Sequence, residues 1–158
     1  MTDITLALKL IHVLGAAVLF GTGLGIAYFM WMAHRTRDAA VIAYTAGVVV
    51  IADALFTATA VIAQPISGAL LAWSLGHSMG DSWLVVSLAL YVLVGLCWLP
   101  VVGIQIALRN LARTAAATGS ELPARYHRLF RMWFALGWPA FLGVIGIFAL
   151  MIWRPQLW

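Results

Sequence analysis

His12 is the side chain best placed to do chemistry in this sequence. It lies about eight residues inside the first of four apolar stretches, each long enough to cross a bilayer. An ionisable side chain at that depth is costly unless a partner or a ligand compensates it. The residues alone leave two interpretations open: His12 ligates the metal of a cofactor, or it is hydrogen-bonded between helices.

Other polar and small residues fall at the same depth. With a rise of about 1.5 Å per residue, four positions lie roughly 12 to 16 Å below the outer face of the membrane. They are His12, Gln64, Tyr91 and Gly146. The sequence therefore predicts a polar layer in the outer half of a helix bundle, with Gln64 and Tyr91 bordering a site at His12.

Small residues surround His12 on its own helix. At about 100° per residue, Gly15, Ala16 and Gly23 share the face of His12. Their small side chains predict space for a flat ligand beside the imidazole.

The opposite face of the same helix carries Ala17, Gly21 and Gly25. This small-xxx-small stripe is typical of close helix packing in membranes. It indicates packing within the bundle or between protomers, so a homo-oligomer is among the expected partners.

The composition sets the class of the protein. Hydrophobic residues make up 65% of the chain and charged residues only 9%, far below the roughly one-quarter charged residues of soluble domains. We expect an all-α, polytopic membrane protein with a single domain, 1–158, embedded in a lipid bilayer. The one cysteine, Cys97, falls in an apolar run and offers neither a disulfide nor a thiolate metal site.

The hydrophobic pattern predicts a bundle of four transmembrane helices. The second apolar stretch, 41–75, would be roughly 50 Å long as one helix, well beyond the roughly 30 Å hydrocarbon core. Residues 39–52 are therefore expected to form a helical extension or an interfacial segment, and Asp53 to be a solvated charge at the cytoplasmic boundary. The expected spans are 4–32, 54–75, 83–108 and 132–153.

Charge asymmetry predicts the orientation. Arg35 and Arg37 flank the first connection and five arginines lie between 109 and 131, whereas the second connection has no Lys or Arg. The positive-inside rule places the first and third connections in the cytoplasm and both termini on the outer side. We expect a multi-pass protein of the bacterial cytoplasmic (inner) membrane, whose basic segments bind lipid headgroups and not nucleic acid.

Tryptophans near the span ends fit an aromatic belt. They are Trp31, Trp73, Trp83, Trp133, Trp153 and Trp158, and Trp98 alone is expected to be buried at depth.

Several short blocks of the chain resemble a known family. The chain as a whole resembles a bacterial family of predicted integral membrane proteins of unknown function. The blocks that carry this resemblance are Phe20-Gly21-Thr22-Gly23, Gln64-Pro65, Trp98-Leu99-Pro100 and the run from Trp133 to Pro139.

The first span also resembles a second family. The segment from Leu8 to Gly15, followed by Phe20-Gly21 and by His34-Arg35, is similar to the first helix of the HemJ-type membrane protoporphyrinogen oxidases. This resemblance implies that His12 is the metal ligand of a haem b and that Lys9, three residues earlier, pairs with a haem propionate. It also implies a small hydrophobic or tetrapyrrole substrate and oxidoreductase activity.

The sequence departs from the HemJ pattern in the later spans. HemJ-type proteins carry a lysine early in span three, histidines at its far end and an Asn-Glu pair before the proline of span four. This chain has Trp83-Leu84-Val85-Val86, Trp98-Leu99-Pro100 and Leu136-Gly137-Trp138-Pro139 there. Haem binding is compatible with these changes, whereas the proton transfers of the oxidase need other groups.

Three functions therefore follow from the sequence. The first is a b-type haem-binding protein, with or without oxidoreductase activity. The second is a small transporter or channel subunit with Gln64, Asp53 and Gln105 as its polar path. The third is a structural membrane protein that binds a partner without a cofactor.

Overall fold

The computed structural model describes residues 3–158, and this part of the chain is all-helical. Four helical stretches are long and apolar enough to cross a membrane, as the hydrophobic pattern predicts. The elements are α1 (Asp3–Thr36), α2 (Ala39–Ala52), the π-helical turn η1 (Asp53–Thr57), α3 (Ala58–Ser74), α4 (Ser82–Thr118) and α5 (Ala124–Trp153).

The second membrane crossing is one continuous helix of 36 residues, Ala39–Ser74, made of α2, η1 and α3. Residues 39–52 are thus a helical extension, one of the two expected alternatives. The Asp38 carboxylate caps its start by accepting hydrogen bonds from the backbone N–H groups of Ala40 and Val41.

The polar stretch after the third span is helical, contrary to the expected connection from Arg109 to Ser120. Helix α4 runs on to Thr118 and ends where Gly119 adopts a left-handed φ of 62°. Alanine and arginine are among the best helix formers, so this segment continues the helix beyond the apolar span, and glycine at the left-handed position stops it.

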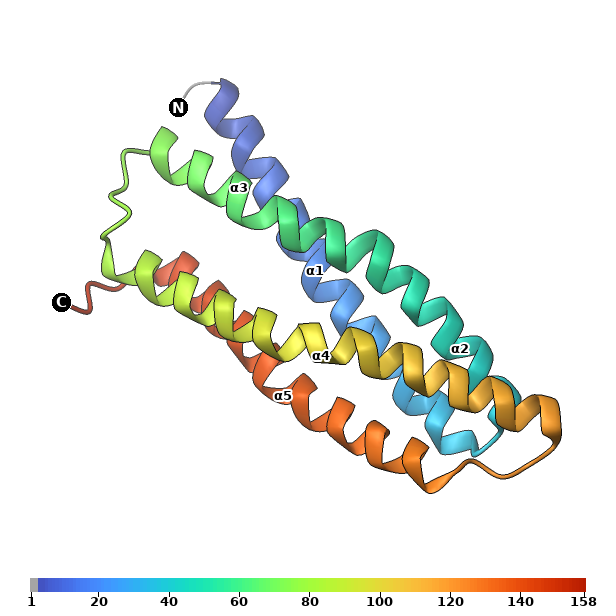
Figure 1. Cartoon of the computed structure of the whole chain (residues 1–158). Coiled ribbons are helices and arrows are strands. Elements are labelled where there is room, and N and C mark those ends of the chain that lie inside the picture. The colour runs from blue at the N-terminus through green and yellow to red at the C-terminus, as the bar shows by residue number, and fades with distance from the viewer. Residues whose placement is uncertain (1–2) are drawn as a thin grey trace.

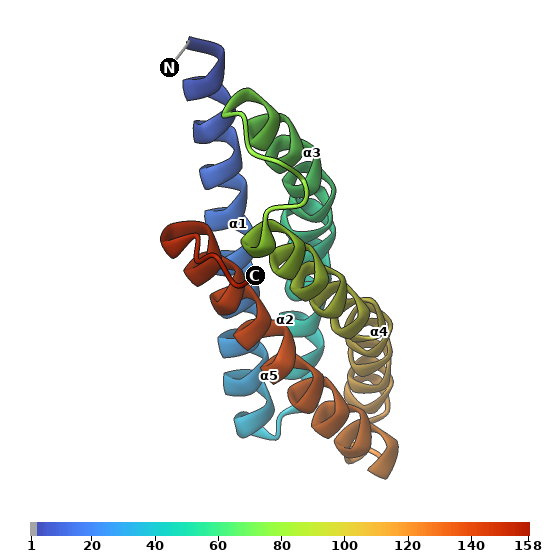
Figure 2. The same ribbon diagram turned by 90° about the vertical axis from the view of Figure 1, so that its left-hand side faces the viewer.

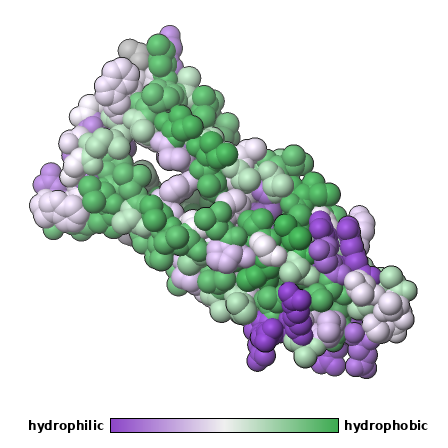
Figure 3. Space-filling view, viewed as in Figure 1, coloured by the Kyte–Doolittle hydropathy of each residue, from purple (hydrophilic) through white to green (hydrophobic). Residues whose placement is uncertain are grey.

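The helices pack as two antiparallel pairs that share one end. Helix α1 lies along α3 and α2, and α5 lies along α4 (Figures 1 and 2). Helix α2 packs on α4, whereas α3 and α4 diverge toward the end of the bundle where both termini lie (Figure 1). Figure 3 shows the molecule hollowed between these diverging parts.

The main core lies at the end of the bundle away from the termini. Its fully buried members include Ile42, Ala46, Leu108 and Tyr126. A much smaller cluster of Ala72, Trp83 and Leu84 closes the other end, so the half that contains His12 is held by fewer contacts.

The outer surface is suited to lipid. Large apolar side chains such as Leu14, Leu96 and Ile152 are exposed on several helices, and Figure 3 shows an apolar surface with polar residues gathered at the end away from the termini. The expected aromatic belt is wrong for Trp83 and Trp133, because both are buried between helices. Trp98, which is expected to be buried, is only partly buried.

Candidate functional site

The α1–α3 interface brings His12 together with two polar side chains of α3. The His12 Nδ1 atom lies 3.0 Å from the Ser67 hydroxyl oxygen, and the Gln64 side-chain amide donates a hydrogen bond of 3.0 Å to the His12 backbone carbonyl. Gln64 and Ser67 lie on one face of α3 because they are three residues apart. We call His12, Gln64, Ser67 and the two glycines described next the His12 site.

Two glycines let the helices approach at this point. A Cβ atom on Gly68 would lie 3.0 Å from Cε1 of the His12 ring, and a Cβ atom on Gly15 would lie 2.8 Å from Nε2 of Gln64. Both distances are shorter than ordinary van der Waals contacts. The glycines therefore fix the imidazole and the amide in their places, as small residues do at membrane helix interfaces.

Gly15 thus has a role different from the expected one. The sequence predicts that it leaves space for a flat ligand, but the Gln64 amide fills the space beside it. Gly23 does keep open space beside it, and Ala16 is half-buried.

The other two side chains expected at the site lie farther out or on another helix. Tyr91 on α4 donates a short hydrogen bond to the Val61 backbone carbonyl, one turn from Gln64, and so joins the two helix pairs. Lys9 is exposed on α1. The structure therefore unites His12, Gln64 and Gly15 directly, with Tyr91 nearby.

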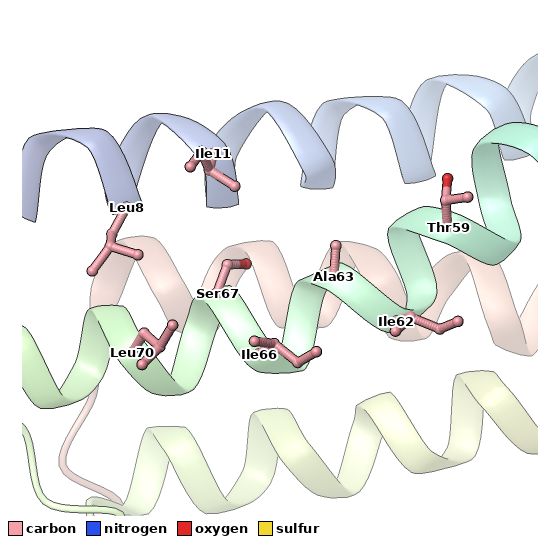
Figure 4. Close-up of a pocket in the computed structure, with 8 residues that line it drawn as sticks. All are labelled: Leu8, Ile11, Thr59, Ile62, Ala63, Ile66, Ser67 and Leu70. Atoms are coloured by element: carbon pink, nitrogen blue, oxygen red, sulfur yellow. The ribbon is translucent and has the colours of Figure 1, made fainter. Parts of the chain in front are cut away.

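An apolar groove with a volume of about 390 Å³ opens next to the site, between α1 and α3. Ser67 lines the groove together with Leu8 and Ile11 of α1, as Figure 4 shows. Its remaining lining residues are Thr59, Ile62, Ala63, Ile66 and Leu70. The groove could therefore accept an apolar ligand surface beside the histidine.

The sequence reasoning did not single out Ser67 and Gly68. Their spacing does indicate that they share a helix face with Gln64, because both follow it within one helical turn in the segment Gln64-Pro65-Ile66-Ser67-Gly68. The helical period alone, however, does not reveal which helix they meet.

The remaining histidines lie at the ends of the bundle. His34 stacks on Phe130 with ring centroids 3.7 Å apart and lies 3.2 Å from the Tyr126 hydroxyl. His77, in the turn between α3 and α4, lies 3.3 Å from an Asp81 carboxylate oxygen. His34 thus joins the last turn of α1 to α5, and His77 pairs within the turn that contains it.

Asp53 forms a second polar site. The expectation of a solvated charge at the cytoplasmic boundary is wrong for this residue, which is only 4% exposed. One of its carboxylate oxygens accepts a hydrogen bond of 3.2 Å from the Trp98 indole of α4, and the other is buried without a partner. The packing of η1 on α1 and the Trp98 side chain of α4 enclose this position, which the sequence pattern of one helix does not reveal.

Comparison with known proteins agrees with the apolar helical architecture. The model of the family described as predicted integral membrane protein (DUF2269) matches residues 6–155. The chain belongs to this family of integral membrane proteins. No curated protein and no solved structure matches the chain. The similarity of span one to HemJ-type proteins stays a prediction.

Proposed function

We propose that this protein binds haem b in the membrane, with the Nε2 atom of His12 as the ligand of the iron. The observation that carries the proposal is the hydrogen-bond chain from His12 Nδ1 through the Ser67 hydroxyl to the Gln64 backbone carbonyl.

This chain selects one protonation form of the ring. A carbonyl oxygen can only accept, so the Ser67 hydroxyl donates its proton to Gln64 over 3.2 Å. With its proton directed there, the same hydroxyl accepts a hydrogen bond from Nδ1, so we assign the ring proton to Nδ1. In the neutral ring, the Nε2 atom consequently carries the lone pair that a metal requires.

Such a partner is the usual companion of a metal-binding histidine. The ring nitrogen that does not bind the metal is commonly oriented by a hydrogen bond to a carbonyl, a carboxylate or another polar group. Ser67 supplies that bond, while Gly68 packs against the ring and restrains its rotation.

Further residues would contribute to a haem pocket. The open space beside Gly23, the small side chain of Ala16 and the apolar groove between α1 and α3 would accept an apolar macrocycle. Lys9, exposed three residues before His12, would pair with a propionate. Bound haem would supply a one-electron redox centre.

We propose haem binding without the HemJ oxidase reaction. That reaction needs proton acceptors near a tetrapyrrole substrate, and the later spans carry tryptophans, aliphatic residues and glycine at those positions. We also propose the orientation expected from the arginines, with both termini outside the bacterial cytoplasmic membrane.

The test is an absorption spectrum of the purified protein, as isolated and after reconstitution with haem. Wild type should show a Soret band that His12→Ala abolishes or strongly shifts. His77→Ala is the matched control, because it removes a histidine from a connection, and it should leave the band unchanged. Ser67→Ala should keep the band but weaken haem retention, since the ligand ring loses its orienting bond.

Two outcomes would refute the proposal. A wild-type protein that stays colourless after reconstitution does not bind haem. A His12→Ala protein with an unchanged spectrum holds its haem through another residue.

A further inference from the structure

We propose that Asp53 is a membrane-embedded proton-binding site, separate from the His12 site. It lies on the π-helical turn between α2 and α3, eleven residues from Gln64. A buried carboxyl group at this position needs hydrogen-bond partners for both oxygens. The structure supplies a partner for only one of them.

The unsatisfied oxygen of Asp53 carries the inference. Its Oδ1 atom accepts the Trp98 indole hydrogen bond, whereas Oδ2 is buried without a partner. Burying an unpaired carboxylate oxygen is far more costly than burying a protonated carboxyl group. A proton bound at Oδ2 removes the charge and gives this oxygen a hydrogen to donate.

Thr57 is a second buried polar group on the π-helical turn. Its side chain is 5% exposed, and its hydroxyl oxygen is buried without a partner. In a regular helix a threonine hydroxyl commonly bonds to the carbonyl four residues earlier. Here the Asp53 carbonyl accepts the N–H of Ala58, and the Thr57 hydroxyl oxygen, four residues along the chain from Asp53, has no hydrogen-bond partner among the described residues.

Counter-ions do not account for the buried group. Asp53 forms no ion pair within residues 3–158, and it is the only charged residue between 39 and 74. On α4, Arg109 lies eleven residues beyond Trp98, roughly 16 Å along the helix axis.

Helix α1 places its ionisable groups equally far away. His12 lies beside Gln64, so the antiparallel register sets residue 23 opposite Asp53. His12 and His34 are each eleven residues from that point, again roughly 16 Å. With no cation in reach, protonation is the remaining way for this chain to neutralise the carboxyl group.

Infrared spectroscopy of the full chain in lipid nanodiscs tests the proposal directly. The carbonyl stretch of a protonated carboxylic acid is separated from the bands of carboxylates and amides. The other acidic side chains, Asp3, Asp38, Asp81 and Glu121, are exposed or partly exposed, whereas Asp53 is buried. Wild type at neutral pH should therefore show this band from a single carboxyl group.

Variants assign the band to Asp53. Asp53→Asn should abolish it, and the matched control Asp38→Asn, at an exposed helix cap, should retain it. Trp98→Phe keeps the carboxyl group but removes the indole donor, so the band should move to higher frequency. This second variant keeps the test valid if Asp53→Asn fails to fold.

Three results would overturn the proposal. Wild type without the band has an ionised Asp53. A band that survives in Asp53→Asn belongs to another group. Loss of the band when sodium chloride replaces choline chloride at constant pH would assign the site to a metal cation and not to a proton.

Discussion

Gly15→Ala is the sharpest test of the packing that orients the His12 site. The new Cβ atom would lie 2.8 Å from Nε2 of Gln64, whereas ordinary contacts begin at 3.4 Å. The amide would have to move by about 0.6 Å, which would disturb the hydrogen bond that it donates to the His12 carbonyl. Gln64 is only 7% exposed, so it has little room to do so.

The expected loss of stability combines three effects. A side-chain hydrogen bond within a membrane bundle is worth about 0.6 kcal/mol on average, and overpacking costs about 1–3 kcal/mol. Alanine gains up to about 1 kcal/mol in helix propensity over glycine. We expect a net destabilisation of about 1 kcal/mol or somewhat more.

Gly21→Ala is the matched control on the same helix. Contrary to the packing within the bundle expected for the stripe of Ala17, Gly21 and Gly25, Gly21 is exposed and a Cβ atom on it meets nothing within 4 Å. This variant should therefore gain the propensity without a steric cost inside the bundle. Both proteins can be unfolded by sodium dodecyl sulfate in mixed micelles and followed by circular dichroism. Their free energies of unfolding should differ by about 2 kcal/mol. Equal changes in the free energy of unfolding of the two variants would refute the close packing of Gly15 on Gln64.

Three other measurements test the fold. Gly143→Ala should destabilise the bundle by about 1–3 kcal/mol in the same titration, because its Cβ atom would lie 2.7 Å from a Val94 methyl group at the α4–α5 interface. Reporters fused at Trp158 and inserted near Thr118 should report opposite sides of the membrane, and a cytoplasmic signal at Trp158 would contradict the arginine-based orientation. Cys97 is buried, so a maleimide should label it only after unfolding, and rapid labelling of the folded protein would contradict its burial.

Local patterns account for the parts of the fold that the sequence predicts. The four membrane-crossing helices follow from apolar length alone. The meeting of His12 with Gln64 follows from equal depth, because antiparallel helices bring residues at one depth to one level. To predict which side chains face each other, one must know how each helix is rotated about its axis, and the single sequence does not determine this rotation. Ser67 and Gly68 were missed for this reason.

Asp53 shows where a general rule fails. The avoidance of buried carboxylates predicts a solvated residue near the membrane boundary. The structure instead buries Asp53 on η1, which packs on α1, and supplies one hydrogen bond from Trp98 of α4. The indole that makes this bond is 45 residues away in sequence, beyond the reach of any periodicity argument.

The π-helical turn explains how one long helix serves two different partners. A π turn is closed by a hydrogen bond that spans five residues instead of four, so it rotates the helix that follows it relative to an unbroken α-helix. Before the turn, α2 packs on both α4 and α1, and Asp53 at the start of the turn bonds to Trp98 of α4. After the turn, α3 packs on α1, where Gln64 and Ser67 meet His12. Asp53 thus bonds to a side chain of α4, whereas the polar pair of α3 bonds to α1. We therefore expect substitutions at Asp53 and at His12 to disable the proposed proton site and the proposed haem ligand independently.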